Sequence, residues 1–90
     1  MGENMEKDLT IVIPAYEPDD KLITLVEQLN SSLDIPDIIV VDDGSKDKNI
    51  FESLKKYSNV ILLCHEVNKG KGAALKTAFK YIDYNIMNKN

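Results

Sequence analysis

The run Ile-Ile-Val-Val-Asp-Asp at residues 38–43 constrains the fold more than any other part of the chain. A strand with one wet face alternates apolar and polar residues, whereas an unbroken apolar run indicates a strand covered on both faces. Such strands are typical of parallel sheets flanked by helices, in which ligands bind at the carboxyl ends of the strands. Asp42 and Asp43 follow the run directly, which makes them candidates for holding a ligand.

Hydrophobic periodicity divides the chain into three units, each a strand followed by a helix. The predicted strands span residues 9–13, 37–41 and 59–64, and the first ends before Pro14 because proline cannot donate to a ladder within a strand. Apolar stripes at helical spacing predict helices within residues 22–33, 50–57 and 74–82. This alternation predicts an α/β fold with a parallel three-stranded sheet of order 3-2-1, right-handed crossovers and flanking helices.

Composition limits the partners and the setting of the protein. The net charge of −4 and the lack of arginine argue against binding nucleic acid. A single cysteine, Cys64, indicates a reducing, cytoplasmic setting, and no apolar run is long enough for a transmembrane segment. We expect residues 1–8 to be a disordered or expression-derived leader and residues 9–90 to form the folded part.

Three polar loops leave the carboxyl ends of the predicted strands, at residues 14–20, 42–47 and 65–73. In a parallel sheet these loops meet at one edge, where a carboxylate, an aromatic ring and a lysine together suit a nucleotide. The alternative is that Asp42 and Asp43 only cap the following helix and that Tyr16 only packs. Since successive strand residues point to opposite faces, only one of the two aspartates can share a given side of the crevice.

Other chemical motifs are incomplete. The glycines at positions 70 and 72 fit neither the dinucleotide fingerprint nor a Walker loop, and they also suit a tight entry to the next helix. No Cys/His cluster has metal-site spacing, and the lone histidine, His65, has no Ser or Cys with which to form a nucleophilic triad. We therefore predict no catalytic and no metal-binding residue within this chain.

Residues 11–20, 38–47 and 68–79 together resemble the amino-terminal half of a family 2 glycosyltransferase of the GT-A fold. The resemblance covers the chain from about Leu9 to Tyr84 and is strongest to bacterial polyprenyl-phosphate sugar synthases. It implies a three-layer, Rossmann-like half of a GT-A fold and a nucleotide-sugar donor linked to UDP or GDP.

The resemblance also implies the residues that contact the donor. The predicted nucleotide-binding set is Pro14, Ala15, Tyr16, Glu17, Asp42, Asp43, Gly44 and Lys71. Within it, the Pro-Ala-Tyr turn and Asp43 hold the base and ribose, and Lys71 reaches the base. The family often reads Pro-Ala-Tyr-Asn-Glu, whereas here Glu17 precedes Pro18, so the acidic side chain lies one residue early.

Family members carry an Asp-x-Asp motif on the next strand, which holds Mg²⁺ or Mn²⁺ and the diphosphate, and a catalytic base further along. This sequence ends before that strand would begin. We therefore expect a segment that is inactive alone, from an enzyme that works in the cytoplasm or at the cytoplasmic face of a membrane.

Three further expectations concern alternatives and assembly. A non-catalytic nucleotide-binding or assembly module is the main alternative, and Val-Val-Asp-Asp-Gly also resembles the acidic pocket of a phosphoacceptor receiver domain. Receivers, however, place the acidic pair after the first strand. With no fourth strand beside it, the first strand is an apolar edge, so we predict a homodimer in which two such edges pair.

Overall fold

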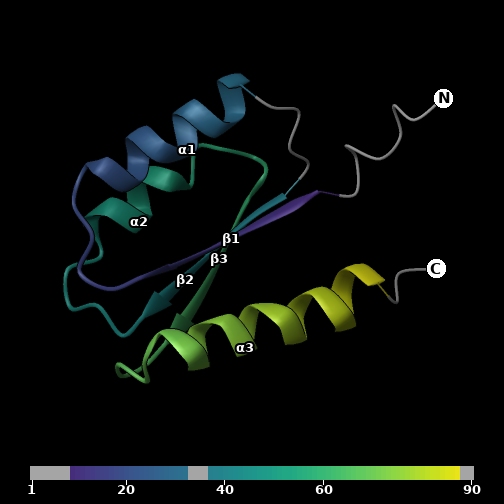
Figure 1. The fold of residues 1–90 in the computed structure, drawn as a ribbon. Coiled ribbons are helices and arrows are strands. Elements are labelled where there is room, and N and C mark those ends of the chain that lie inside the picture. Colours follow the sequence, from purple (N-terminus) through teal and green to yellow (C-terminus); the bar gives the residue numbers. More distant parts are fainter. Residues whose placement is uncertain (1–8, 33–36, 88–90) are drawn as a thin grey trace, which may run out of the picture.

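The computed structural model describes residues 9–32 and 37–87, which form a three-stranded sheet with helices on both faces (Figure 1). The strands are β1 (Thr10–Ala15), β2 (Asp37–Asp43) and β3 (Val60–His65). The helices are α1 (Lys21–Ser32), α2 (Asn49–Leu54) and α3 (Lys71–Tyr81), and α3 continues into the π-helical segment η2 (Ile82–Met87). The predicted leader at residues 1–8 lies outside the described residues.

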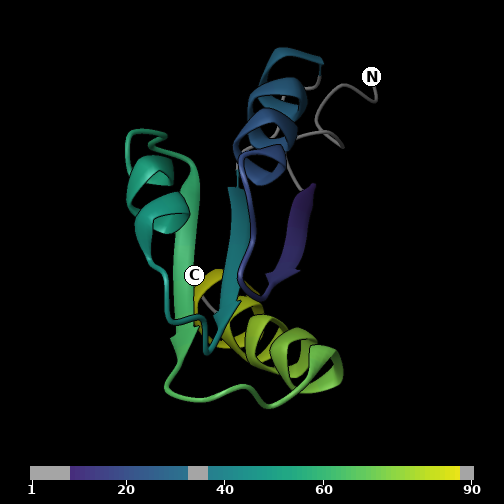
Figure 2. The same ribbon diagram turned by 90° about the vertical axis from the view of Figure 1, so that its left-hand side faces the viewer.

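The sheet is parallel and has the order β1-β2-β3, as predicted. Helices α1 and α2 cover one face and α3 covers the other, so the fold has three layers (Figures 1 and 2). The central strand β2 is sealed on both faces, since Ile38 through Val41 have no exposed surface. This burial explains the unbroken apolar run in the sequence, because neither face of β2 meets water.

Alternate residues of β2 contribute to two separate small cores. On one face Ile38 and Val40 pack with residues of α1 and α2, including Val26 and Leu54. On the other face Ile39 and Val41 pack with α3, whose Ala74 and Ala78 are fully buried. Alanine at both helix positions allows α3 to lie close to the sheet, which brings the start of α3 next to the ends of β1 and β2.

Four predicted boundaries were wrong by two residues or more. Strand β2 continues to Asp43, two residues beyond its predicted end, and helix α3 begins at Lys71, three residues before the predicted range. Strand β1 runs through Pro14 to Ala15, two residues beyond the predicted end. Proline is tolerated here because β1 is an edge strand of the sheet formed by residues 9–32 and 37–87, and a missing N–H can lie on the side away from β2. Helix α2 ends at Leu54 rather than at Tyr57, whose N–H bonds to the Leu54 carbonyl oxygen in a separate turn.

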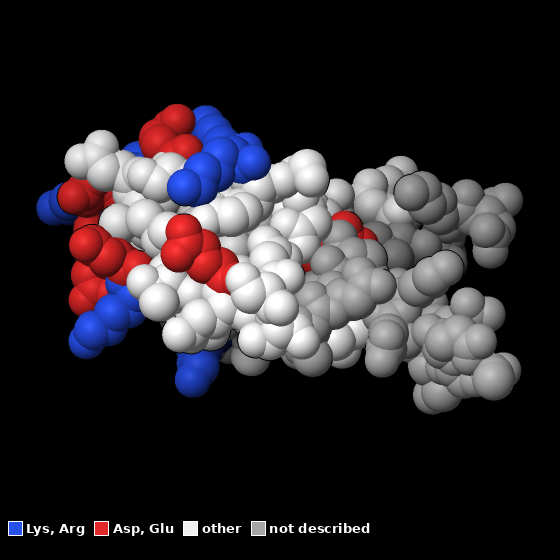
Figure 3. Space-filling view, turned by 90° about the horizontal axis from the view of Figure 1, so that it is seen from above, with Lys and Arg blue, Asp and Glu red and all other residues white. Residues whose placement is uncertain are grey.

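The surface over α1 and α2 carries both signs of charge. In Figure 3, acidic and basic side chains lie interspersed and gather toward the end of the molecule where the strands finish. No helix in the described part of the chain is long and apolar enough to cross a membrane. Because charged side chains gather where the strands finish (Figure 3), this end of the sheet is the region in which a binding site is expected.

Gly44 joins the two loops that follow β2 and β3. Its φ of +82° lies in the left-handed region, which favours glycine. A Cβ built at this position would lie 2.3 Å from both the Val67 carbonyl carbon and the Asn68 nitrogen, much closer than real Cβ contacts. Both conformation and space therefore require glycine here, and the two backbones contact each other directly.

We predict that Gly44→Ala destabilises the fold by at least about 2 kcal/mol, because a strained φ adds to a backbone overlap that no side-chain rotation can relieve. The matched control is Gly72→Ala in the first turn of α3, where nothing lies within 4 Å of the added Cβ. That variant should be neutral or stabilising by up to about 1 kcal/mol. Urea denaturation followed by circular dichroism measures both, and equal midpoints for Gly44→Ala and the wild type would contradict the close approach.

Candidate functional site

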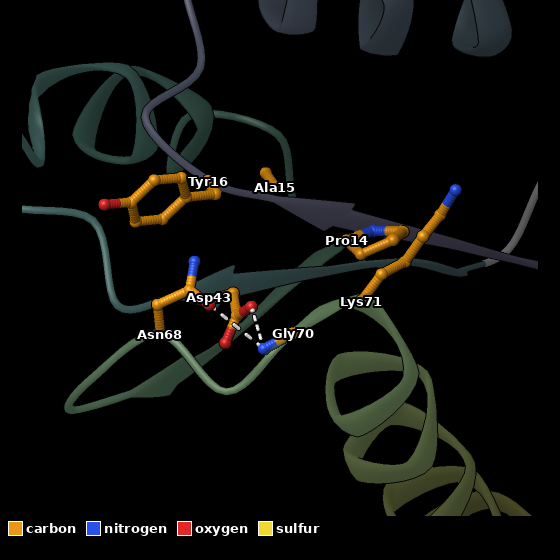
Figure 4. Close-up of a pocket in the computed structure, with 7 residues that line it drawn as sticks. All are labelled: Pro14, Ala15, Tyr16, Asp43, Asn68, Gly70 and Lys71. Atoms are coloured by element: carbon orange, nitrogen blue, oxygen red, sulfur yellow. Dashed lines mark hydrogen bonds between the residues drawn. The ribbon is translucent and has the colours of Figure 1, made fainter.

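A pocket of about 230 Å³ opens where β1 and β2 end and α3 begins. Its lining comes from three separate segments: Pro14, Ala15, Tyr16, Asp43, Asn68, Gly70 and Lys71 (Figure 4). Five of these seven residues belong to the nucleotide-binding set predicted from the sequence. The parallel sheet brings them together because all three segments leave or approach the carboxyl ends of the strands.

Asp42 and Asp43 point to opposite sides of the sheet, as strand alternation predicts. Asp42 accepts a 2.9 Å hydrogen bond from the Ser45 N–H and pairs with the Lys48 ammonium at 2.6 Å. Burial raises the pKa of Asp42, but the hydrogen bonds from Lys48 and Ser45 outweigh it and hold that pKa below the usual value. Asp42 thus closes the β2–α2 loop. Because the two carboxylates share no pocket, the geometry argues against a phosphoacceptor site.

Asp43 holds the connection between β3 and α3. Its Oδ1 accepts hydrogen bonds from the Lys69 N–H at 2.8 Å and from His65 Nδ1 at 2.8 Å, and its Oδ2 accepts one from the Gly70 N–H at 2.9 Å. The hydrogen bond from Lys69, followed by that from His65, holds the pKa of Asp43 below its usual value. The carboxylate is therefore ionised at neutral pH.

One acceptor site of this carboxylate remains free of these contacts. An ionised carboxylate offers about four lone-pair sites, and the three donors named above use both on Oδ1 and one on Oδ2. Figure 4 shows Asp43 among the lining residues, between Asn68 and Gly70 and hydrogen-bonded to Gly70. A ligand N–H or O–H can bind to the remaining site on Oδ2.

His65 links this carboxylate to helix α3. The imidazole is buried, and its Nε2 lies 2.7 Å from the Thr77 hydroxyl oxygen. Because a carboxylate can only accept, Nδ1 carries a proton and donates to Asp43, and in this tautomer Nε2 accepts from the Thr77 hydroxyl. His65 had no predicted role, although strand alternation with Ile61 and Leu63 places it on the face that α3 covers.

The remaining lining residues offer a flat apolar surface and a positive charge. Pro14, Ala15 and the half-exposed ring of Tyr16 supply the apolar part, and Lys71 is exposed at the first position of α3. An aromatic face can stack on a base, while an ammonium can donate to a carbonyl oxygen. Asn68, which the sequence analysis also missed, adds a side-chain amide at the rim.

Three residues of the predicted set lie outside the pocket lining and hold the loops: Glu17, Asp42 and Gly44. The carboxylate of Glu17 accepts from the Lys46 N–H at 2.7 Å, and its own N–H donates to the Ser45 hydroxyl at 2.7 Å. These bonds stabilise a φ of +46°, which is unusual for a residue with a side chain. Glu17 therefore fastens the β1–α1 loop to the β2–α2 loop.

A divalent metal does not fit the residues that the structure describes. Among residues 9–32 and 37–87, no group of three or more His, Cys, Asp or Glu side chains is placed to hold an ion. Asp42 and Asp43 already accept hydrogen bonds from several donors of the protein itself. What this site can offer a ligand is stacking, hydrogen bonding and one ammonium group.

Comparison with known proteins matches almost the whole chain to one family. Residues 10–87 fit the family model described as glycosyl transferase family 2. The chain is 31% identical over 86 residues to a dolichyl-phosphate beta-glucosyltransferase of Trichomonas vaginalis, which covers 82% of this chain and 27% of that protein. No solved structure gives a significant match.

Two further relatives have similar names. A UDP-N-acetylglucosamine–dolichyl-phosphate N-acetylglucosaminyltransferase of Methanococcus voltae is 34% identical over 91 residues, covering 83% of this chain and 36% of that protein. The human dolichyl-phosphate beta-glucosyltransferase is 32% identical over 84 residues, covering 78% of this chain and 26% of that protein. The chain thus spans about a quarter to a third of the length of these relatives.

We predict that Asp43 stabilises the fold at neutral pH but not in acid. Its pKa in the folded state lies below the ordinary value of 3.8, so the unfolded chain takes up a proton first as the pH falls. The stabilisation is therefore complete above about pH 5 and is lost as the pH falls through the folded pKa. Urea titrations of the wild type and Asp43→Asn at pH 7 and pH 3 measure this. A difference that is as large at pH 3 as at pH 7 would contradict it.

We also predict that His65 acts on Asp43 through Nδ1. In His65→Asn the amide nitrogen can replace Nδ1, whereas in His65→Gln it lies nearer the position of Nε2. The Asn variant should therefore keep the amide NMR signals of Lys69 and Gly70 near their wild-type positions, and the Gln variant should shift both. Identical spectra for the two variants would show that the bond to Asp43 does not place this loop.

Proposed function

Because the chain belongs to glycosyl transferase family 2, we propose that it is the amino-terminal segment of an enzyme that transfers a sugar from a nucleotide-sugar donor. In this proposal the pocket at the strand ends holds the base and ribose of a donor linked to UDP or GDP. The observation that carries it is Asp43, an ionised carboxylate fixed by three donors that keeps one acceptor site beside an aromatic ring and a lysine.

Each lining group has a matching partner on a nucleotide. Asp43 accepts a hydrogen bond from a ring N–H of the base or from a ribose hydroxyl. The ring of Tyr16 stacks on the base, and the ammonium of Lys71 donates to a carbonyl oxygen of the base. Uracil and guanine both combine a ring N–H with a carbonyl oxygen, so the pocket chemistry suits either base.

The metal and the catalytic groups belong to the rest of the proposed enzyme. Mg²⁺ or Mn²⁺ would stabilise the leaving diphosphate, a contribution of several kcal/mol to the barrier in typical cases. The described residues provide no such metal site, so we propose that this chain alone does not transfer sugar.

The acceptor and the location are extensions of the same proposal. The relatives described above are named as dolichyl-phosphate enzymes, which is consistent with the resemblance to polyprenyl-phosphate sugar synthases. We propose a polyprenyl-type phosphate as the acceptor of the whole protein and the cytoplasmic face of a membrane as its location. The free thiol of Cys64 supports a reducing compartment.

A non-catalytic nucleotide-binding or assembly module is the second candidate. It is favoured by the combination of a formed pocket with no metal cluster among the residues that the structure describes. The two candidates differ in one measurement on the whole protein. Transfer of sugar to a lipid phosphate by that protein supports the enzyme, and nucleotide binding without transfer supports the module.

We predict weak binding of UDP or GDP to this chain, nearly independent of Mg²⁺, because the pocket lacks a diphosphate clamp. Amide NMR titration should shift the signals of Ala15, Tyr16, Asp43, Gly44 and Lys71. Asp43→Ala should abolish these shifts, and Tyr16→Ala should weaken binding without touching the β3–α3 loop.

The matched control is Glu52→Gln, which removes one carboxylate from the surface of α2, where it pairs with Lys55. This variant should bind like the wild type. Shifts confined to other regions, or no shifts at millimolar nucleotide, would count against the pocket as a nucleotide site.

We further propose that two copies of the chain pair through β1. Among the residues that the structure describes, β2 is the one strand that pairs with β1, and the side chains of β1 are half-buried. Pro14 lies within β1, so an antiparallel partner would pair over Thr10–Ile13 to give a continuous six-stranded sheet. The resulting dimer would have two-fold symmetry.

We predict a dimer in sedimentation equilibrium at micromolar concentration, which Val12→Lys and Ile11→Pro should convert to a monomer. Val12→Thr keeps the strand preference and adds no charge, so this control should leave the dimer intact. A folded monomeric wild type would exclude the dimer, and a dimer that survives both changes must be held elsewhere.

A further inference from the structure

A second cavity lies along α3, outside the nucleotide pocket. It has a volume of about 400 Å³ and is lined by His65, Lys69, Gly72, Ala73, Lys76, Thr77 and Lys80. None of these residues lines the pocket around Asp43. Figure 2 shows the connection from β3 sweeping past the ends of the strands before α3 begins, and the cavity lies between the end of β3, this connection and one flank of the helix. We call it the basic groove.

Three lysines surround the basic groove. In the described part of the chain, no carboxylate forms an ion pair with Lys69, Lys76 or Lys80. Lys76 and Lys80 lie four residues apart on one side of α3, where like charges repel each other. A chain with a net charge of −4 thus gathers three unpaired ammonium groups around one cavity, at some cost to the helix.

The backbone at the start of α3 adds further donors to the groove. Gly72 and Ala73 lie in the first turn of α3, where backbone N–H groups have no carbonyl acceptor within the helix. The first hydrogen bond of the helix runs from the Ala74 N–H to the Gly70 carbonyl oxygen, at 3.1 Å. Thr77 and His65 also line the groove, but their hydrogens are already used, since Thr77 donates to His65 and His65 donates to Asp43. The N–H groups of the first turn of α3 and the three ammonium groups therefore remain as the donors that line this cavity.

We propose that the basic groove binds a phosphate group, at a site separate from the nucleotide pocket. A phosphate monoester carries a charge of roughly −1.5 to −2 and three strong acceptor oxygens, which match several ammonium and N–H donors at once. The volume leaves room for an organic group attached to the phosphate. This chemistry is shared by soluble phosphorylated compounds and by the headgroup of a phospholipid, and it does not depend on the proposed function of the other pocket.

The test is an amide NMR titration of the 90-residue chain with inorganic phosphate and then with diphosphate, at an ionic strength held constant with sodium chloride. Saturable shifts at Gly72, Ala73, Lys76 and Thr77 are expected. Shifts that rise linearly with phosphate, or that spread evenly over the surface lysines, would overturn the proposal.

Matched variants separate the groove from general charge effects. Lys76→Gln with Lys80→Gln, and the control Lys55→Gln with Lys56→Gln in the turn just after α2, each lower the net charge from −4 to −6. The groove variant should weaken phosphate binding by about tenfold or more, the effect of losing one charge-assisted hydrogen bond, while the control binds like the wild type. Equal affinities would overturn the proposal. All four lysines are exposed, so both variants should fold.

Two further arms identify the source of the phosphate and isolate the second site. Co-sedimentation with phosphatidylcholine vesicles that contain phosphatidic acid, if lost in the groove variant, assigns a lipid headgroup. Saturable phosphate binding without vesicle binding assigns a soluble ligand. If phosphate causes no shifts and the wild type and both variants bind vesicles equally, the groove is not a phosphate site. Tyr16→Ala should leave phosphate binding unchanged, so failure of the nucleotide pocket and failure of the groove give different results.

Discussion

The rest of the site depends on the hydrogen bonds that Asp43 accepts from the β3–α3 connection. The carboxylate at the end of the central strand fixes Lys69 and Gly70 through their N–H groups and orients the imidazole of His65. Because Gly70 is the residue before α3, the same bonds determine where this helix begins. One buried charge thus positions the helix start and presents an acceptor to the pocket.

Much of this arrangement follows from local sequence pattern. The unbroken apolar run of β2 predicted a strand covered on both faces, and the alternation of strand and helix predicted the parallel sheet. The carboxyl ends of parallel strands then bring Tyr16, Asp43 and Lys71 to one pocket, as expected. These predictions succeed because period and strand order depend on neighbours along the chain and on general packing rules.

The parts that the sequence could not predict depend on contacts between distant segments. His65 meets Asp43 through one ring nitrogen and Thr77 through the other only because β3 pairs with β2 in a register that sets residue 43 opposite residue 65. Glu17 looked like a ligand contact by motif, yet its carboxylate is committed to the N–H of Lys46, 29 residues away. The strand end at Pro14 is a different case, since the predicted strand order already made this strand an edge, where proline is tolerated.

The close approach of Gly44 to Val67 and Asn68 has a consequence for how such a pocket can change. The loops around it are located by main-chain contacts, by Asp43 and by the Glu17 bonds, none of which involves the side chains of Tyr16 or Lys71. The contacts that hold the loops in place are therefore independent of the side chains that would touch a ligand. Substitutions at Tyr16 and Lys71 can change the surface that a ligand would meet while the backbone around the pocket stays in place, so one scaffold can serve different ligands.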